Sequence, residues 1–182
     1  EVLFYRDPKK TQDLILITAD AQAMSPRGIY EISDYLATLI HQLGVKKVLA
    51  LGAYPTKNSK NEQVDIFITS TEQKYIQEFL ASGDTKIVNK GVIIGSNGLI
   101  PTLAKARFGI EGIVLLAETD NSAVMNENIT DLQASIQLLD LVGKYFQLPI
   151  KNTFSENRIS EISQDLESKR KQLEEELETI QP

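Results

Sequence analysis

One stretch of the sequence decides the fold: GVIIGSNGLIPTLAKARFGIEGIVLLAETD, residues 91–120. Within it, Gly95-Ser-Asn-Gly98 combines glycines with side chains that cap helices, which predicts a turn into a helix. Pro101 falls in the first turn of that helix, where a missing N–H does little harm, and Gly109 ends it. The continuous apolar run Ile113–Ala117 is typical of a strand covered on both faces. The stretch therefore predicts a turn, a helix and a buried strand of an α/β fold.

The segments upstream follow the same pattern. Val92–Ile94 is apolar and too short for a helix, which favours a strand or an extended entry. A long helix is defined by Ser25 as its cap, Pro26 at its first position and Gly44 as its stop. Its apolar residues recur at spacings of three and four and predict one core-facing stripe: Ile29, Ile32, Leu36, Leu39, Ile40 and Leu43.

Further strands are predicted from apolar and β-branched runs. Val45–Leu51 follows the long helix after a single glycine, as in βαβ units, which implies a parallel sheet. A polar loop at 52–63 leads to a strand at Val64–Thr69. Thr71 then caps a helix that runs to Ser82, and Lys86–Val88 is a short strand.

The N-terminal residues predict a hairpin. Val2–Arg6 and Leu14–Thr18 flank a charged, turn-rich loop. Because Leu14–Ile17 is apolar on consecutive residues, we expect the second strand to be central and buried. Since the chain starts without Met, we also expect that the domain lacks its N-terminal segment.

The C-terminal part predicts two helices. The first, from about Asn126 to Leu148, is apolar on more than one face, which predicts burial against the sheet and against a second element or subunit. Residues 151–182 form a linker and an amphipathic helix. This helix either lies across the domain or is an arm for self-association or partner docking. Its narrow apolar stripe consists of Ile159, Ile162, Leu166, Leu173, Leu177 and Ile180. The expected architecture is a three-layer α/β/α domain with a mostly parallel sheet at residues 1–150, followed by this C-terminal helical arm.

Composition limits the classes of function. The net charge of −6 argues against nucleic acid or an anionic membrane as the main partner. No apolar run is long enough for a transmembrane helix. The absence of cysteine excludes disulfides and cysteine-based metal sites and favours a reducing compartment, so we expect a cytoplasmic protein.

Catalytic and nucleotide-binding motifs are missing from the sequence. His41 is the only histidine and lies off the apolar stripe of its helix, which indicates a surface residue. Ser96 is not a hydrolase nucleophile, because the elbow motif Gly-x-Ser-x-Gly requires glycine where Ile94 stands. Neither a dinucleotide-binding glycine motif nor a P-loop is present. We therefore predict no catalytic residue, no metal ligand and no cofactor.

Polar residues follow several predicted strands and would gather at one edge of a parallel sheet. We define the strand-end crevice by this set: Asp20, Gly95, Ser96, Asn97, Gly98, Glu118, Thr119 and Asp120, with Gly52 and Thr69 beside them. Its carboxylates would suit Mg²⁺, and its glycine turn would offer N–H groups to an anion. The alternative is that polar residues simply end strands, as they do in most α/β proteins.

Four motifs carry a resemblance to a known family. They are Pro26-x-Gly28-x-Tyr30-Glu31, LGVKKVLALGAY at 43–54, IGSNGL at 94–99 and GIEGIVLLAET at 109–119. In this order and spacing they resemble the proteasome assembly chaperone family of the second-subunit type, in its archaeal and bacterial branch, over roughly residues 1–150.

The resemblance implies an α/β/α domain without established catalytic residues, which forms a homo-oligomer and acts on proteasome subunits. Some archaeal members dock through a C-terminal hydrophobic–Tyr–any tail, whereas this chain ends Ile180-Gln181-Pro182. We expect a non-enzymatic binding protein that forms a trimer or tetramer and recognises proteasome subunits or a related ring assembly. The alternative is an ATP-grasp-like or other nucleotide- and Mg²⁺-dependent enzyme that uses the strand-end crevice.

Overall fold

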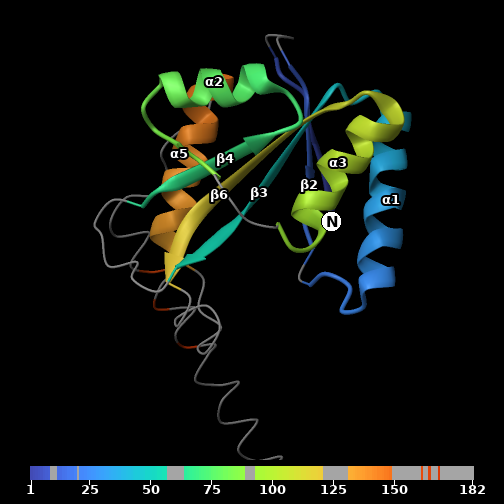
Figure 1. Ribbon diagram of the computed structural model, residues 1–182, viewed down its shortest axis with the longest axis horizontal. Helices are drawn as coiled ribbons and strands as arrows, with labels where there is room; N and C mark the ends of the chain where they lie inside the picture. The colour runs from blue at the N-terminus through green and yellow to red at the C-terminus, as the bar shows by residue number, and fades with distance from the viewer. Residues whose placement is uncertain are drawn as a thin grey trace, which may run out of the picture.

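The computed structural model describes residues 1–8, 12–19, 21–56, 64–88, 93–120 and 131–148, with isolated positions at 161, 164 and 168 (Figure 1). Asp20, the whole apolar stripe of the predicted arm and the linker at 151–155 lie outside the described residues. The division into residues 1–150 and 151–182 therefore stays a prediction.

A four-stranded sheet forms the centre of the molecule, in the order β3-β6-β4-β5. These strands are β3 (Lys47–Thr56), β6 (Glu111–Asp120), β4 (Ile66–Ser70) and β5 (Lys86–Ile87). The pairs β3–β6 and β4–β5 are parallel, whereas β6 and β4 are antiparallel. Two of the three pairings are therefore parallel, and the sheet is mixed.

Helices cover both faces of this sheet. On one side lie α1 (Pro26–Gln42) and α3 (Ser96–Phe108), and on the other α2 (Gln73–Ala81) and α5 (Leu132–Phe146), as Figure 1 shows. The predicted α/β class, with helices flanking a central sheet, is confirmed.

Side chains alternate between the two faces of β6, so this strand contributes to a hydrophobic core on each face of the sheet. Ile113, Leu115 and Ala117 are buried with Ile66 and Ile68 of β4 under α2 and α5. The second core lies between α1, α3 and the other face of the sheet, and contains Ala37, Ile40, Ala104 and Ile110. β6 is thus covered on both sides, as its continuous apolar run predicts.

The first long helix packs with a face that matches the predicted stripe only in part. Ser25 caps α1 as expected, since its hydroxyl accepts a hydrogen bond from Gly28 N at 3.0 Å. Of the predicted stripe, Ile40 is buried and Ile29, Leu36 and Leu39 are half-buried. However, Ile32 and Leu43 are exposed, and Ser33 and Ala37 are fully buried. The reason is that α1 packs against α3 rather than directly on the sheet, and small side chains allow two helices to approach closely.

The N-terminal hairpin forms, but it does not join the central sheet. Among the strands that the structure describes, β1 (Val2–Tyr5) and β2 (Leu14–Ile17) pair only with each other, in antiparallel register. Leu16 and Ile17 are exposed, so the prediction of a buried second strand is wrong. Consecutive apolar residues indicate a strand that is apolar on both faces. They do not show whether other elements of the same chain cover those faces.

Several boundaries differ from the sequence prediction. β3 continues through Gly52 and Pro55, because it is an edge strand and a proline there needs no ladder partner on its open side. Thr71 does not cap α2; its hydroxyl binds Gly112 instead. Ile93 and Ile94 lie outside any strand.

α5 is described from Leu132, with Asp131 as its cap. Residues 126–130 of the predicted helix lie outside the described residues.

Candidate functional site

The residues in the first turn of α3 contact three different parts of the structure. Ser96 Oγ accepts a hydrogen bond from Ser33 Oγ of α1 at 3.3 Å. Asn97 lies over Gly52 of β3, so closely that a Cβ atom added to Gly52 would come within 2.6 Å of the Asn97 Nδ2 atom. Gly98 packs against Ile93. The glycine turn predicted from the sequence is present, with Gly95 at a φ of 93°, but its side chains do not converge.

Two polar residues at the end of β6 also lie apart, on different faces of the sheet. Glu118 accepts a hydrogen bond from Thr56 Oγ1 at 2.8 Å. Thr119 is buried and, because side chains alternate along a strand, lies on the opposite face of the sheet. Asp120 ends β6, and its side chain is outside the described residues.

Thr69 does not lie beside the end of β6. Because β4 is antiparallel to β6, Thr69 pairs with Val114 near the start of β6, not near its end. The expectation that Thr69 joins the strand-end crevice rested on a parallel β4 and is wrong. Among the described residues, no group of three or more acidic or histidine side chains is arranged to hold a metal ion. Ligand binding by the strand-end crevice stays a prediction.

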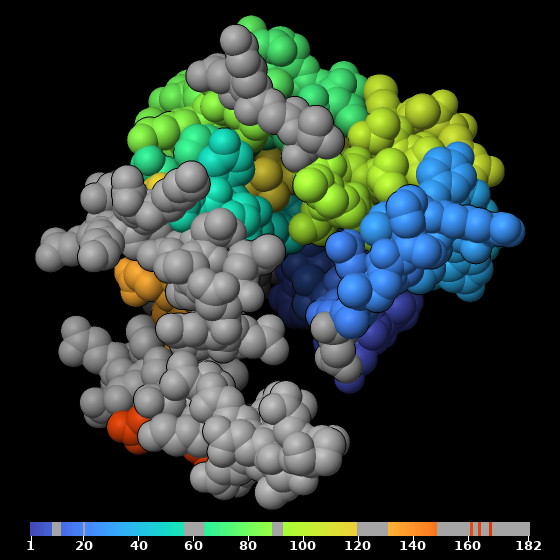
Figure 2. Space-filling view, turned by 60° about the horizontal axis from the view of Figure 1, so that its bottom comes forward, coloured from blue at the N-terminus to red at the C-terminus, as the bar shows by residue number. Residues whose placement is uncertain are grey.

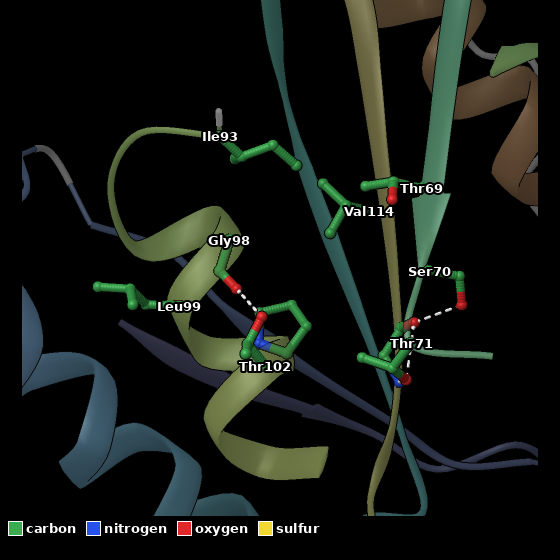
Figure 3. Close-up of a pocket in the computed structure, with 10 residues that line it drawn as sticks. Thr69, Ser70, Thr71, Ile93, Gly98, Leu99, Thr102 and Val114 are labelled. Atoms are coloured by element: carbon green, nitrogen blue, oxygen red, sulfur yellow. Dashed lines mark hydrogen bonds between the residues drawn. The ribbon is translucent and has the colours of Figure 1, made fainter. Parts of the chain in front are cut away.

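A cavity of about 370 Å³ lies between α3 and strands β4 and β6 (Figure 3). Ile93 and Val114 point toward each other across it. Its lining combines apolar groups with four hydroxyl side chains: Thr69, Ser70, Thr71, Ile93, Gly98, Leu99, Pro101, Thr102, Gly112 and Val114.

Most hydroxyls of this cavity donate to backbone oxygens. Ser70 Oγ donates to Gly112 O at 2.6 Å, and Thr102 Oγ1 donates to Gly98 O at 2.7 Å. Thr71 Oγ1 accepts from Gly112 N at 2.9 Å and donates weakly to Gly112 O at 3.4 Å. Among the described residues, the Thr69 hydroxyl has no hydrogen-bond partner. The sequence prediction missed this cavity, although a glycine inside a strand, Gly112, is a signal of close backbone approach.

A charged and aromatic cluster lies on the opposite face, between α2 and the start of β6. Glu111 accepts from Lys74 Nζ at 2.6 Å and from the Tyr75 hydroxyl. The Lys74 ammonium, followed by the Tyr75 hydroxyl, holds the pKa of Glu111 below its ordinary value of 4.5. Lys47 Nζ lies 4.6 Å from the centre of the Tyr75 ring, within cation–π range. The cluster joins β3, α2 and β6, which indicates a structural role.

The only histidine is where the sequence prediction places it. His41 is exposed and stacks on Phe108, with ring centres 4.3 Å apart. None of the helices in the described parts of the chain has the length and apolarity that a membrane crossing requires.

Comparison with known proteins identifies the family. A model of the PAC2 family matches residues 1–181. The chain belongs to the PAC2 family. The resemblance drawn from the four sequence motifs is thereby confirmed.

Solved structures share the PAC2 fold. PbaB of Pyrococcus furiosus, an archaeal proteasome activator, has a TM-score of 0.70 at 21% identity, over 98% of this chain and 70% of PbaB. PbaA of the same organism, an archaeal homolog of proteasome-assembly chaperone, has a TM-score of 0.72 at 21% identity, over 96% of this chain and 71% of PbaA. At such identities the likeness shows the fold.

A curated relative is longer than this PAC2 chain. An uncharacterised protein of Methanocaldococcus jannaschii is 25% identical over 176 residues, which are 97% of this chain and 64% of the relative. The chain therefore spans slightly less than two thirds of the length of that relative.

Among the described residues of this PAC2 chain, exposed large apolar side chains are most numerous on the β1–β2 hairpin and on α1, both visible on the face in Figure 2. We define the apolar hairpin surface as Val2, Leu3, Phe4, Tyr5, Leu16 and Ile17, with exposed fractions between 37% and 68%. On α1 the exposed residues are Tyr30, Ile32 and Tyr35. By contrast, the apolar side chains of α5 are all buried or half-buried. Although this helix is apolar on more than one face, it has no exposed apolar face that a second subunit could cover.

Proposed function

We propose that this PAC2 chain is a non-enzymatic binding protein that recognises proteasome subunits, or a related ring assembly, by surface complementarity. The family supports the proposal, and so does the likeness in fold to PbaB and PbaA, described as a proteasome activator and a homolog of proteasome-assembly chaperone. Action in the cytoplasm is part of the proposal.

The apolar hairpin surface is the observation that carries this proposal. Val2 and Phe4 belong to one face of the hairpin and Leu3 and Leu16 to the other, so both faces are apolar and both are exposed. Exposed apolar surface of this extent, rimmed by polar residues, is characteristic of sites where another protein binds. No observation in the described residues favours the nucleotide- and Mg²⁺-dependent alternative.

The test is a pull-down of proteasome α-subunits from the same source with the purified full chain. The double variant Phe4→Thr, Leu16→Thr removes one large apolar group from each face of the hairpin and keeps β-branched residues that favour strands. We expect recovery of the α-subunits to fall by about tenfold or more, since large apolar side chains carry much of the energy of such contacts.

The matched control is Ile87→Thr, which changes an exposed apolar strand residue on β5, at the edge of the central sheet. This variant should recover as much α-subunit as the unmodified chain. A third sample without residues 156–182 tests the predicted arm. Failure of the unmodified chain to recover any α-subunit would contradict the proposal. Full recovery by the hairpin variant would place the contact elsewhere.

A further inference from the structure

We propose that the cavity between α3 and strands β4 and β6 binds a small uncharged molecule with an apolar body and at least one hydroxyl or amide hydrogen-bond donor. This site is independent of the proteasome-subunit contact proposed above, because the cavity and the apolar hairpin surface share no residue.

The size and the walls of the cavity suit a small ligand. Its volume of about 370 Å³ falls within the range of roughly 300 to 1,000 Å³ that is usual for ligand pockets. One wall is rigid, because Pro101 on α3 stands directly against Gly112 on β6. Ile93 and Val114 face each other and offer an apolar surface to the body of a ligand (Figure 3).

The balance of donors and acceptors decides which polar group the ligand carries. Each hydroxyl has one proton to donate and lone pairs that accept. Thr102 and Thr71 both direct their protons to backbone oxygens, so toward a ligand their oxygens act as acceptors. Only Thr69 has its proton free among the described hydroxyls of the cavity. The cavity therefore has more free hydrogen-bond acceptors than donors, which favours a ligand that carries hydrogen-bond donors.

Among the described residues, the cavity has no charged lining group that could bind an ion. None of the lining residues is ionisable. Two acidic residues are neighbours of the lining residues along the chain. Glu72 follows Thr71 and pairs with Lys105, and Glu111 precedes Gly112 and pairs with Lys74. A charged ligand would lose its hydration without meeting a free counter-charge, whereas a neutral donor would meet an acceptor.

The experiment is a protein-observed NMR titration of the full chain with two probes of equal shape, cyclohexanol and cyclohexanone. Only cyclohexanol donates a hydrogen bond. We expect saturable shifts at Val114, Thr69 and Leu99. Cyclohexanol should bind about threefold to tenfold more tightly, the range expected for one neutral hydrogen bond.

Three variants sharpen this test. Thr69→Val keeps the shape of the side chain and removes its hydroxyl, and should weaken cyclohexanol binding by about threefold to tenfold. Thr102→Val, at an exposed position of α3, removes an acceptor from the opposite wall and should also weaken it. Thr38→Val changes a comparable hydroxyl on α1, which donates to Asp34 O, and should leave binding unchanged.

Several results would overturn the inference. One is a set of shifts that do not saturate, or that concentrate on the hairpin. Another is equal affinity for the two probes. A third is unchanged cyclohexanol binding in both Thr69→Val and Thr102→Val, with the fold intact by circular dichroism. None of these results depends on the pull-down of proteasome subunits, so the two proposals fail separately.

Discussion

Gly112 sets the distance between α3 and the central strand. A Cβ atom at this position would lie 2.6 Å from Pro101 Cβ and 3.2 Å from Thr71 Cγ2. Both neighbours are fixed, the first by its ring and the second by its hydrogen bonds to Gly112. The helix must therefore move away if the glycine is replaced, and the floor of the cavity moves with it.

We expect Gly112→Ala to lower the free energy of unfolding by about 1–3 kcal/mol, as overpacking usually does. Gly52→Ala is the comparison on β3. Its new Cβ would meet the Asn97 Nδ2 atom at 2.6 Å, but that atom ends a flexible side chain and can rotate away. Urea denaturation of both variants measures the difference. An equal or larger loss for Gly52→Ala would contradict this account of α3 packing.

The lowered pKa of Glu111 makes part of the stability depend on pH. Lys74 and then Tyr75 lower this pKa below 4.5, so the stabilisation is present above that pH and disappears as pH falls through the lower, folded-state pKa. We expect Glu111→Gln to be less stable than the unmodified chain at neutral pH, with a difference that shrinks as the pH falls below 4.5. Denaturant unfolding at several pH values measures it. A difference independent of pH would show that the charge of Glu111 is not involved.

At the scale of elements, capping fixes where α5 begins. Asp131 accepts a hydrogen bond from Ala134 N at 2.9 Å and thereby satisfies one of the free N–H groups of the first turn. We expect Asp131→Ala to cost about 0.5–2 kcal/mol, because this acceptor is lost. Asp131→Asn keeps an acceptor oxygen and should cost much less. Thermal unfolding of the two variants compares them, and equal losses would show that the cap bond contributes little.

Local signals explain why most elements were predictable from the sequence. Ser25 and Pro26 begin α1, and Gly109 ends α3 in the left-handed conformation that glycine favours, with a φ of 70°. These signals act within one turn of the chain, so the sequence contains all that determines them. The same holds for the buried run of β6.

The features that could not be predicted all depend on partners distant in the sequence. The direction of β4 relative to β6 decides the position of Thr69, and nothing within residues 64–70 encodes it. The exposed Ile32 and the buried Ser33 follow from packing of α1 on α3. For the same reason the sequence could not show what the first turn of α3 contacts: Ser96 and Asn97 are neighbours in sequence but contact different elements.

At the scale of the whole molecule, we predict a trimer or tetramer in solution. Multi-angle light scattering of the full chain should return three or four times the mass of one chain, 20.3 kDa. A monomer for the unmodified chain at micromolar concentration would contradict self-association.

The strand order β3-β6-β4-β5 also has a consequence for the synthesis of the protein. β6 is the last of the four strands to leave the ribosome, yet it lies between β3 and β4. Until residue 120 has emerged, β3 has no partner strand in this sheet and β4 has only the two-residue β5. The growing chain must therefore carry unpaired apolar strands, including Ile66 and Ile68, until β6 is complete. A ribosome that stalls before β6 releases a chain prone to aggregate, so the central strand makes completion of the sheet a late event for every new molecule.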